Sequence, residues 1–150
     1  MKDISEKPFF KRVLVIDDTE ADRYIADFGM KRYRFAEEII LKESAARALE
    51  YLRSLENSPE LLPQFIFLDI RMPEMDGFGF LEEYAKLPES VRTNSIIMML
   101  STSLNPEDHK RASANPYVNR FLNKPLNKEN MEFLKKEFAE LHVPVGYHDN

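Results

Sequence analysis

Five polar side chains in this chain of 150 residues stand at the ends of short apolar runs: Asp17, Asp18, Asp69, Ser101 and Lys124. If each run is a strand of an open parallel sheet, the strands end at one crevice, which is where ligands bind in such sheets. Three carboxylates, one hydroxyl and one ammonium group would then meet at a single edge. The pattern therefore predicts a charged site made from four strand ends.

Three carboxylates held close together repel one another and have raised pKa values unless a cation lies between them. Mg²⁺ is the expected cation, because it prefers oxygen ligands and commonly uses one or two carboxylates with water and phosphate oxygens. Zinc is not expected, since none of the three histidines, His109, His142 and His148, ends a strand. A carboxylate beside Mg²⁺ and a lysine can attack phosphorus as a nucleophile, and a hydroxyl can bind a phosphoryl oxygen.

Each of these residues also has an ordinary structural explanation. The pair Asp17 and Asp18 can end a strand or cap a helix, as can Asp69, and Ser101 can bond to nearby backbone. Those roles do not explain why Lys124 and Ser101 would reach the same edge. The combination therefore favours a functional site over four unrelated strand ends.

The composition excludes several other kinds of protein. There is no cysteine, which excludes a disulfide scaffold and a thiolate metal site and fits the reducing cytoplasm where we expect the chain. The four glycines form neither the dinucleotide-binding nor the P-loop pattern. The longest apolar run, residues 96–100, is too short to cross a membrane, and the net charge of −5 argues against nucleic acid as a partner.

The apolar runs are nearly continuous, which is typical of strands covered on both faces of a parallel sheet. The second run is the weakest and could instead end a helix. We expect a charged lead-in at residues 1–11 and a tail at residues 143–150, where Pro144 and Gly146 block a helix. The expected strands are residues 13–16, 38–41, 65–68, 96–100 and 119–123.

The longer segments between the runs are amphipathic and predict helices. In the first, Tyr24, Ile25, Phe28 and Met30 recur at roughly helical spacing, and Ser44 is the expected N-cap of the second. Alternation of strand and helix repeated five times predicts a doubly wound α/β domain with right-handed crossovers. The expected helices are residues 20–33, 44–55 and 78–87, a segment that starts at residue 105, and residues 127–141.

Four stretches make the chain similar to a known family. They read VLVIDD at residues 13–18, FLDIRMPEMDG at 67–77, MLSTS at 99–103 and FLNKP at 121–125. With these stretches the chain resembles the receiver domain of two-component response regulators, from about residue 11 to residue 141. The resemblance implies one domain over residues 12–142, with a flavodoxin-like parallel sheet of five strands in the order 2-1-3-4-5.

The resemblance also implies a role for each residue at the strand ends. Asp69 would be the phosphoacceptor. Asp18 would bind Mg²⁺ directly together with Asp69, Asp17 would act through water, and the backbone carbonyl of Arg71 would complete the protein ligands. Lys124 would pair with the phosphoryl oxygens.

Two residues would carry the response to phosphorylation in such a domain. Ser101 would be the switch hydroxyl that moves toward the phosphoryl group. Phe121 would be the aromatic residue whose side chain turns inward when Ser101 moves. The resemblance therefore predicts a switch as well as a site.

Other residues of the four stretches have structural roles. Pro73 stiffens the loop after the site, and Gly77 is expected to have a positive φ before the next helix. Asp76 would cap that helix. The bond between Lys124 and Pro125 is usually cis in the family, but the sequence of this chain leaves its isomer open.

Three positions depart from the family pattern. Thr102 stands where a small residue is usual, and Arg71 could place its side chain over Asp69, be solvated, or pair with Glu74. Thr102 and Arg71 would both restrict the path of water to an acyl phosphate, so we expect a long-lived phosphorylated state. The Asn-Pro pair at residues 115–116 replaces the usual Gly-Ala and affects only the loop before the last strand.

Three functions fit parts of this pattern. The first is a signalling domain that accepts a phosphoryl group from a histidine kinase or a phosphotransfer protein and is no enzyme beyond its own phosphorylation and dephosphorylation. The second is a pseudo-receiver that binds partners without phosphorylation, which the loss of an acidic residue, Asp69 or Lys124 would favour. The third is a haloacid-dehalogenase-type phosphatase, which needs a second acid where Arg71 stands. The complete set of residues favours the first.

The expected binding partners follow from the interpretation of the chain as a phosphoryl-accepting signalling domain. Since only the tail remains after the receiver region, we expect readout through protein contacts and not through an attached output domain. The resemblance places the contact surface on residues 105–141, where a separate downstream effector or, in a homodimer, a second copy of the chain would bind. No membrane contact is expected.

Overall fold

The computed structural model describes residues 7–141, which form five strands and the helices between them. All neighbouring strands pair in parallel, in the order β2-β1-β3-β4-β5. This order confirms the expected doubly wound, flavodoxin-like sheet. The strands are β1 (Phe10–Ile16), β2 (Ala36–Lys42), β3 (Phe65–Leu68), β4 (Ile96–Ser101) and β5 (Val118–Asn123).

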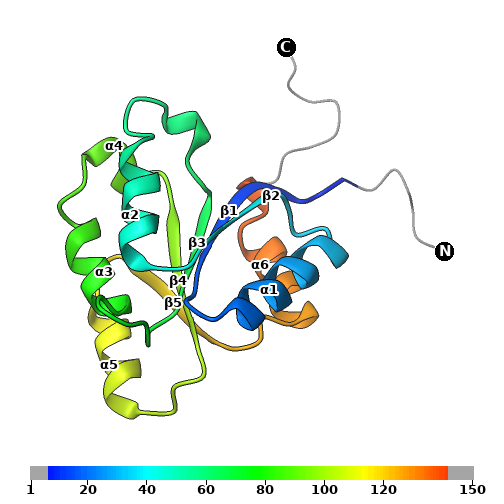
Figure 1. The fold of residues 1–150 in the computed structure, drawn as a ribbon. Coiled ribbons are helices and arrows are strands. Elements are labelled where there is room, and N and C mark those ends of the chain that lie inside the picture. The colour runs from blue at the N-terminus through cyan, green and yellow to red at the C-terminus, as the bar shows by residue number, and fades with distance from the viewer. Residues whose placement is uncertain (1–6, 142–150) are drawn as a thin grey trace.

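Helices cover both faces of the sheet. Figure 1 shows α1 and α6 on one face and α2, α3 and α5 on the other. The sequence does not predict α4, because its four residues are too few to show a helical period. The helices are α1 (Glu20–Arg32), α2 (Ala45–Arg53), α3 (Gly77–Tyr84), α4 (Glu89–Arg92), α5 (Pro106–Ala114) and α6 (Lys128–Glu137), with 3-10 turns at Pro59–Leu61 and Ala139–Leu141.

The central strands bury side chains on both faces, which is why each of them contains a continuous apolar run. Successive residues of β1 point to opposite sides, so Leu14 joins the core beside α2 and α3, whereas Val15 joins the core beside α1 and α6. In the second core the fully buried Phe65 meets the rings of Phe10 and Phe138 edge to face, with centroids 4.8 and 5.2 Å apart. Truncating such a ring to alanine costs about 3–5 kcal/mol, so these contacts fix β1, β3 and the end of α6 to one another.

Side chains before three helices determine where those helices begin. The Ser44 side chain accepts a hydrogen bond from the Arg47 N–H at 3.1 Å, which confirms Ser44 as the N-cap of α2. Asp76 accepts in the same way from the Gly79 N–H at 2.8 Å and caps α3, as expected. Asn105 caps α5. Each cap satisfies an N–H group that has no partner within the helix.

Helix α1 packs on the sheet through a different stripe from the one formed by its large apolar side chains. Met30 is buried, and Ala26 is partly buried against the same core. At Gly29 an added Cβ would lie 3.4 Å from the Met131 side chain, so small residues let α1 approach α6 closely. Three of the recurring apolar residues face solvent instead: Tyr24 (66% exposed), Ile25 (51%) and Phe28 (54%).

The two edges of the sheet carry polar side chains. On β2, Glu37 and Glu38 are exposed. On β5, Asn119 is exposed and Arg120 bonds to Glu137 at 2.9 Å. The exposed edges therefore differ from the apolar central strands.

The described chain begins just before the sheet. β1 begins at Phe10, so the last two residues of the expected lead-in belong to the sheet. Residues 1–6 of the lead-in, residue 142 and the expected tail at residues 143–150 lie outside the described residues. Between residues 7 and 141, no helix has both the length and the apolar character needed to cross a membrane.

Candidate functional site

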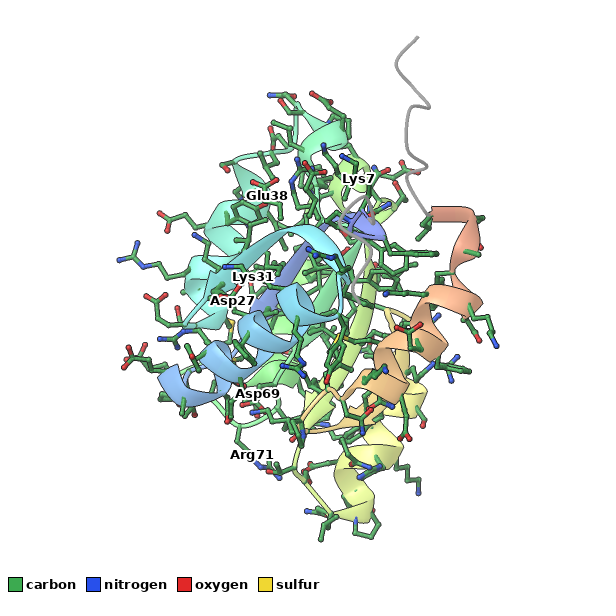
Figure 2. The ribbon with its side chains drawn as sticks, turned by 90° about the vertical axis from the view of Figure 1, so that its right-hand side faces the viewer. Lys7, Asp27, Lys31, Glu38, Asp69 and Arg71 are labelled. Atoms are coloured by element: carbon green, nitrogen blue, oxygen red, sulfur yellow. The ribbon has the colours of Figure 1, made fainter. Side chains whose placement is uncertain are left out.

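The polar residues at the strand ends meet at one edge of the sheet, as their positions in the sequence predict. β1 ends at Ile16 directly before Asp17, and β3 ends at Leu68 directly before Asp69. The Asp69 N–H donates to the carbonyl of Ile16 at 3.0 Å, which places the two strand ends side by side. Figure 2 shows Asp69 at the lower end of the sheet and Arg71 on the loop below it.

Three carboxylates form a cluster that could hold a cation. One oxygen from each of Asp17, Asp18 and Asp69 lies within 4.8 Å of the other two. Opposite ligands of an octahedral Mg²⁺ ion are about 4.2 Å apart, since each Mg–O bond is about 2.1 Å long. Asp17 and Asp69 are buried, whereas Asp18 is exposed, so water can reach one side of the cluster. The donors present fit a small divalent cation that keeps some of its water.

Both carboxylate oxygens of Asp17 are used within the protein. Oδ1 accepts a hydrogen bond from the Thr19 N–H at 3.0 Å, and Oδ2 lies 2.6 Å from Nζ of Lys124. The backbone carbonyl of Asp17 also accepts a bond from the Arg23 guanidinium at 2.8 Å. These contacts fix the orientation of Asp17, so its oxygens are less free than those of Asp18 to turn toward a cation.

Lys124 lies among three carboxylates. Its Nζ is 2.6 Å from Asp17, 2.8 Å from Asp22 and 3.4 Å from Asp69, and its side chain is 12% exposed. Burial by itself lowers the pKa of Lys124, but the hydrogen bonds to Asp17 and Asp22 and the charge of Asp69 raise that pKa above its ordinary value. Lys124 therefore stays charged at neutral pH. The bond from Lys124 to Pro125 is cis, which answers the question that the sequence left open.

The sequence reasoning missed Asp22. This residue lies in the first turn of α1, where an acidic side chain is common because it interacts favourably with the helix dipole. Its position one turn into the helix that follows Asp17 was the available signal, because that turn starts at the edge where the strands end. In the structure Asp22 supplies a second short contact to Lys124.

The carboxylate of Asp69 is held in a defined orientation. Its Oδ1 accepts a hydrogen bond from the Ile70 N–H at 2.8 Å, and its Oδ2 faces Lys124. Burial raises the pKa of Asp69 to about 6; the charge of Lys124 opposes this rise, and the charge of Asp17 adds to it. Asp69 is therefore mostly ionised at neutral pH and easily protonated below it.

Ser101 and Thr102 lie beside the carboxylates. Ser101 is buried, and its Oγ accepts a hydrogen bond from the Ser103 N–H at 3.2 Å, which is the ordinary strand-end role. Its carbonyl also accepts a bond from the Lys124 N–H at 3.1 Å, so Ser101 and Lys124 are tied together at the site. Thr102 lines a cavity of about 210 Å³ that also includes Asp17 and Lys124.

The Arg71 side chain pairs with a residue that the sequence reasoning did not consider. Its Nη2 lies 2.5 Å from Oδ2 of Asp108 on α5, and neither Asp69 nor Glu74 is its partner in this contact. Asp108 is 4% exposed, which is unusual for an aspartate. Its sequence signal is as weak as that of Asp22, because Asp108 too is an acidic residue in a first helical turn.

Gly77 has a different role from the one that we expected. Its φ does not lie in the left-handed region, so the expectation of a positive φ is wrong. A Cβ at this position would lie 2.5 Å from the backbone oxygen of Asp69, and the Gly77 N–H donates to the Ile70 carbonyl at 2.8 Å. Glycine is needed here because α3 begins against the backbone of Asp69. In the same loop it is Glu74 that has a positive φ, of 70°.

Phe121 is half-buried on β5 and is covered by α5. Its ring stacks on the ring of His109, with centroids 3.9 Å apart and an interplanar angle of 24°. Nε2 of His109 also lies 3.0 Å from the carbonyl oxygen of Ser103. The aromatic residue of the expected switch is thus connected to the loop that follows Ser101.

A receiver domain has this arrangement: acidic residues and a lysine meet at the ends of parallel strands in a sheet of the order β2-β1-β3-β4-β5. The response regulator receiver domain model matches residues 13–135. The chain belongs to this family, whose members act in two-component signalling and are not enzymes in the ordinary sense.

Two relatives show the range of proteins that contain such a domain. The chain is 31% identical over 137 residues to the probable methanogenesis regulatory protein FilR2 of Methanothrix harundinacea, which covers 91% of this chain and 84% of that protein. It is also 31% identical over 124 residues to the histidine kinase CKI1 of Arabidopsis thaliana, a match that covers 78% of this chain but only 11% of the kinase.

Solved structures share the fold. A two-component response regulator from Cytophaga hutchinsonii superposes with a TM-score of 0.80 at 26% identity, covering 90% of this chain and 99% of that one. The receiver domain of CKI1 complexed with Mg²⁺ has a TM-score of 0.73 at 25% identity, covering 88% and 95%. A homologous receiver domain thus binds Mg²⁺, and the acidic cluster of this chain could do the same.

Proposed function

We propose that this chain is a phosphorylatable receiver, in which Asp69 accepts a phosphoryl group from a phosphohistidine on a histidine kinase or phosphotransfer protein in a Mg²⁺-dependent reaction. The observation that carries the proposal is the position of Asp69, whose carboxylate belongs to the cation-sized cluster and lies 3.4 Å from Lys124. A phosphorylation-independent pseudo-receiver would need neither feature. The presence of both supports the phosphorylated form.

In the proposed reaction an oxygen of Asp69 attacks phosphorus, and the phosphorus–nitrogen bond of the phosphohistidine breaks. The electron pair of that bond stays with the imidazole nitrogen, which takes up a proton from water, so the donor leaves as neutral histidine. With a pKa of about 6, Asp69 is mostly ionised at neutral pH and can act as the nucleophile. Bound Mg²⁺ would neutralise part of the charge on the phosphoryl oxygens. The ammonium group of Lys124 would neutralise more of it.

The cation would be held by oxygen atoms of four residues. We assign Asp18, Asp69 and the backbone carbonyl of Arg71 as direct ligands and Asp17 as a ligand through water. The contacts of Asp17 support this division, because both of its carboxylate oxygens are already engaged by Thr19 and Lys124. Asp18 is exposed, so a hydrated cation can reach its carboxylate from solvent.

The phosphorylated state would be read by another protein. The Ser101 hydroxyl would leave its bond to the Ser103 N–H for a phosphoryl oxygen, and Phe121 would move with it. These residues lie beside or within residues 105–141, where we place the contact with a downstream effector or, alternatively, with a second copy of the chain. We place this exchange in the cytoplasm and expect no direct contact with nucleic acid.

Intact-mass measurement after incubation with Mg²⁺ and acetyl phosphate tests the proposal. We expect one added phosphoryl group in the wild-type chain and none in Asp69→Asn. Asp27→Asn is a matched control, because Asp27 lies on α1 and pairs with Lys31 away from the strand ends. It should gain the group normally. No gain in the wild type would favour the pseudo-receiver, and a gain in Asp69→Asn would show that another residue is the acceptor.

A further inference from the structure

The carboxylate of Asp108 is buried, charged and outside the acidic cluster. It lies in the first turn of α5, and the residue is 4% exposed. Its Oδ2 accepts a hydrogen bond from the Ser103 hydroxyl at 2.6 Å and faces Nη2 of Arg71. A buried carboxylate is costly unless it is paired and hydrogen-bonded, so this site depends on the cation that Arg71 provides.

The two partners differ sharply in their freedom to move. The Arg71 side chain is 61% exposed, whereas that of Asp108 is 6% exposed. Arg71 stands two residues after Asp69, a span of at most about 7 Å of extended chain, which is within the reach of an arginine side chain. The guanidinium group can therefore leave Asp108 through solvent without moving any helix, but Asp108 cannot follow it.

Ser103 connects this ion pair to both residues of the expected switch. Its N–H donates to Oγ of Ser101, and its hydroxyl donates to Asp108. Its carbonyl oxygen lies 3.0 Å from the His109 ring, which stacks on Phe121. A continuous set of contacts thus runs from the loop after Asp69, through the first turn of α5, to β5.

We propose that the ion pair between Arg71 and Asp108 is a latch that holds the 103–109 segment in its unphosphorylated arrangement, and that a phosphoryl group on Asp69 opens it by binding Arg71. This inference rests on the proposed function. A phosphoryl group carries a charge of about −2 and offers two or three oxygens to the planar guanidinium group, which binds phosphate better than it binds a single carboxylate oxygen. Asp108 then loses its cation while still buried. The first turn of α5 must rearrange to hydrate it.

The latch would be a second connection between the phosphoryl group and the surface at residues 105–141. It starts from the Arg71 side chain and not from the Ser101 hydroxyl. Ser103 and His109 both contact groups that the rearrangement of Asp108 would displace. The surface at residues 105–141 would therefore change through an ion pair that is specific to the residues at positions 71 and 108.

Beryllofluoride with Mg²⁺ is the probe for the test, because it mimics a phosphoryl group on an aspartate and is not hydrolysed. Amide hydrogen exchange reports on residues 103–114, and titration gives the affinity for beryllofluoride. In the wild type we expect exchange over these residues to speed up when beryllofluoride binds. In Asp108→Asn, exchange should be fast without the probe, and the affinity should rise by about fivefold to a hundredfold because Arg71 is already free.

Arg71→Gln breaks the same pair from its exposed side and covers the case in which Asp108→Asn does not fold. It should also speed exchange over residues 103–114 without the probe, but it should weaken beryllofluoride binding. Glu137→Gln is the matched control, because it breaks another arginine–carboxylate pair, between Arg120 on β5 and Glu137 on α6, which does not include Ser103 or Asp108. This control should change neither measurement.

The outcomes separate the latch from the proposed function. If the wild type binds beryllofluoride but Arg71→Gln leaves exchange over residues 103–114 unchanged, the latch is wrong and phosphorylation stands. If Asp108→Asn binds the probe no more tightly than the wild type, the proposal that Asp108 and the phosphoryl group compete for Arg71 is wrong. If the wild type binds no beryllofluoride, the proposed function fails, and the trigger of the latch fails with it.

Discussion

Two cations near the strand ends of this chain are held in different ways. The Lys124 side chain is 12% exposed and lies within 3.4 Å of three carboxylates, whereas the Arg71 side chain is 61% exposed and, among residues 7–141, pairs with Asp108 alone. A cation with several partners in a buried site keeps its position, because losing any one contact leaves the others intact. A cation on an exposed stem with one partner can exchange that partner for another. The difference suggests one fixed and one movable positive charge.

The largest expected effect is on stability, and it separates the two cations. Lys124→Met should lower the free energy of unfolding by about 2–4 kcal/mol, because it leaves a group of buried carboxylates without their cation. Arg71→Met should lower it by less, because it leaves only one buried carboxylate, that of Asp108, without its cation, and this carboxylate keeps its hydrogen bond from Ser103. Urea denaturation in EDTA measures both. If both variants lose the same free energy of unfolding, Lys124 is not held more firmly than Arg71.

Two further variants refine this test. They are the single variant Asp22→Asn and the double variant that combines Lys124→Met with Asp69→Asn. The first removes a half-exposed partner of Lys124 and should cost less than about 1 kcal/mol. The double variant should be more stable than Lys124→Met alone, because one fewer carboxylate is left without its cation. A double variant that is less stable would show that Lys124 acts by packing and not by charge.

The second expected effect is a dependence of stability on pH. Burial raises the pKa of Asp69 to about 6 from its ordinary value of 3.8, so between these values the folded protein holds a proton that the unfolded chain does not. The stability that the folded protein gains by holding this proton on Asp69 is therefore fully present below pH 3.8 and is lost as the pH rises through 6. In metal-free buffer, Asp69→Asn should remove this contribution, so the gain in stability of the variant over the wild type should be larger at pH 7 than at pH 5.

Thermal unfolding of both proteins at several pH values measures this effect. Asp27→Asn should follow the wild-type profile. If Asp69→Asn and the wild type differ by the same amount at pH 5 and pH 7, the carboxylate of Asp69 does not titrate in this range. Added Mg²⁺ should remove the difference at neutral pH, because a bound cation favours the ionised carboxylate.

The smallest expected effect is on the lifetime of phospho-Asp69. Thr102 lines the cavity beside the site, and Arg71 would shield the acyl phosphate from water once it has left Asp108. Thr102→Ala and Arg71→Asn should each speed phosphate loss in Mg²⁺ by about threefold to tenfold, which corresponds to about 1 kcal/mol of barrier. The control Glu137→Gln should leave the rate of phosphate loss unchanged. A wild-type half-life of seconds that both variants leave unchanged would contradict the expectation.

The strand ends were the most predictable part of the site. The sheet is parallel and buried on both faces, so continuous apolar runs reveal where its strands end and which polar residues follow. Asp17, Asp69 and Ser101 come together for that reason. Their roles in phosphorylation are still predictions.

The residues on helices were not predictable in the same way. Asp22 and Asp108 each lie in a first turn, where an acidic side chain interacts with the helix dipole whether or not it meets a cation. Only the packing of α1 and α5 against the sheet edge turns them toward Lys124 and Arg71. Gly77 shows the same limit, because the close approach of α3 to the backbone of Asp69 leaves no signal in the sequence beyond the glycine itself.

The polar edges of the sheet have a consequence for how partners can bind. A β-edge with exposed backbone groups is a template onto which another chain can add a strand, and charged side chains discourage this pairing. Glu37 and Glu38 line one edge here, and Asn119 and Arg120 line the other. We therefore expect effectors and kinases to recognise this protein through side chains on its helices and loops, and not by extending its sheet into a larger one.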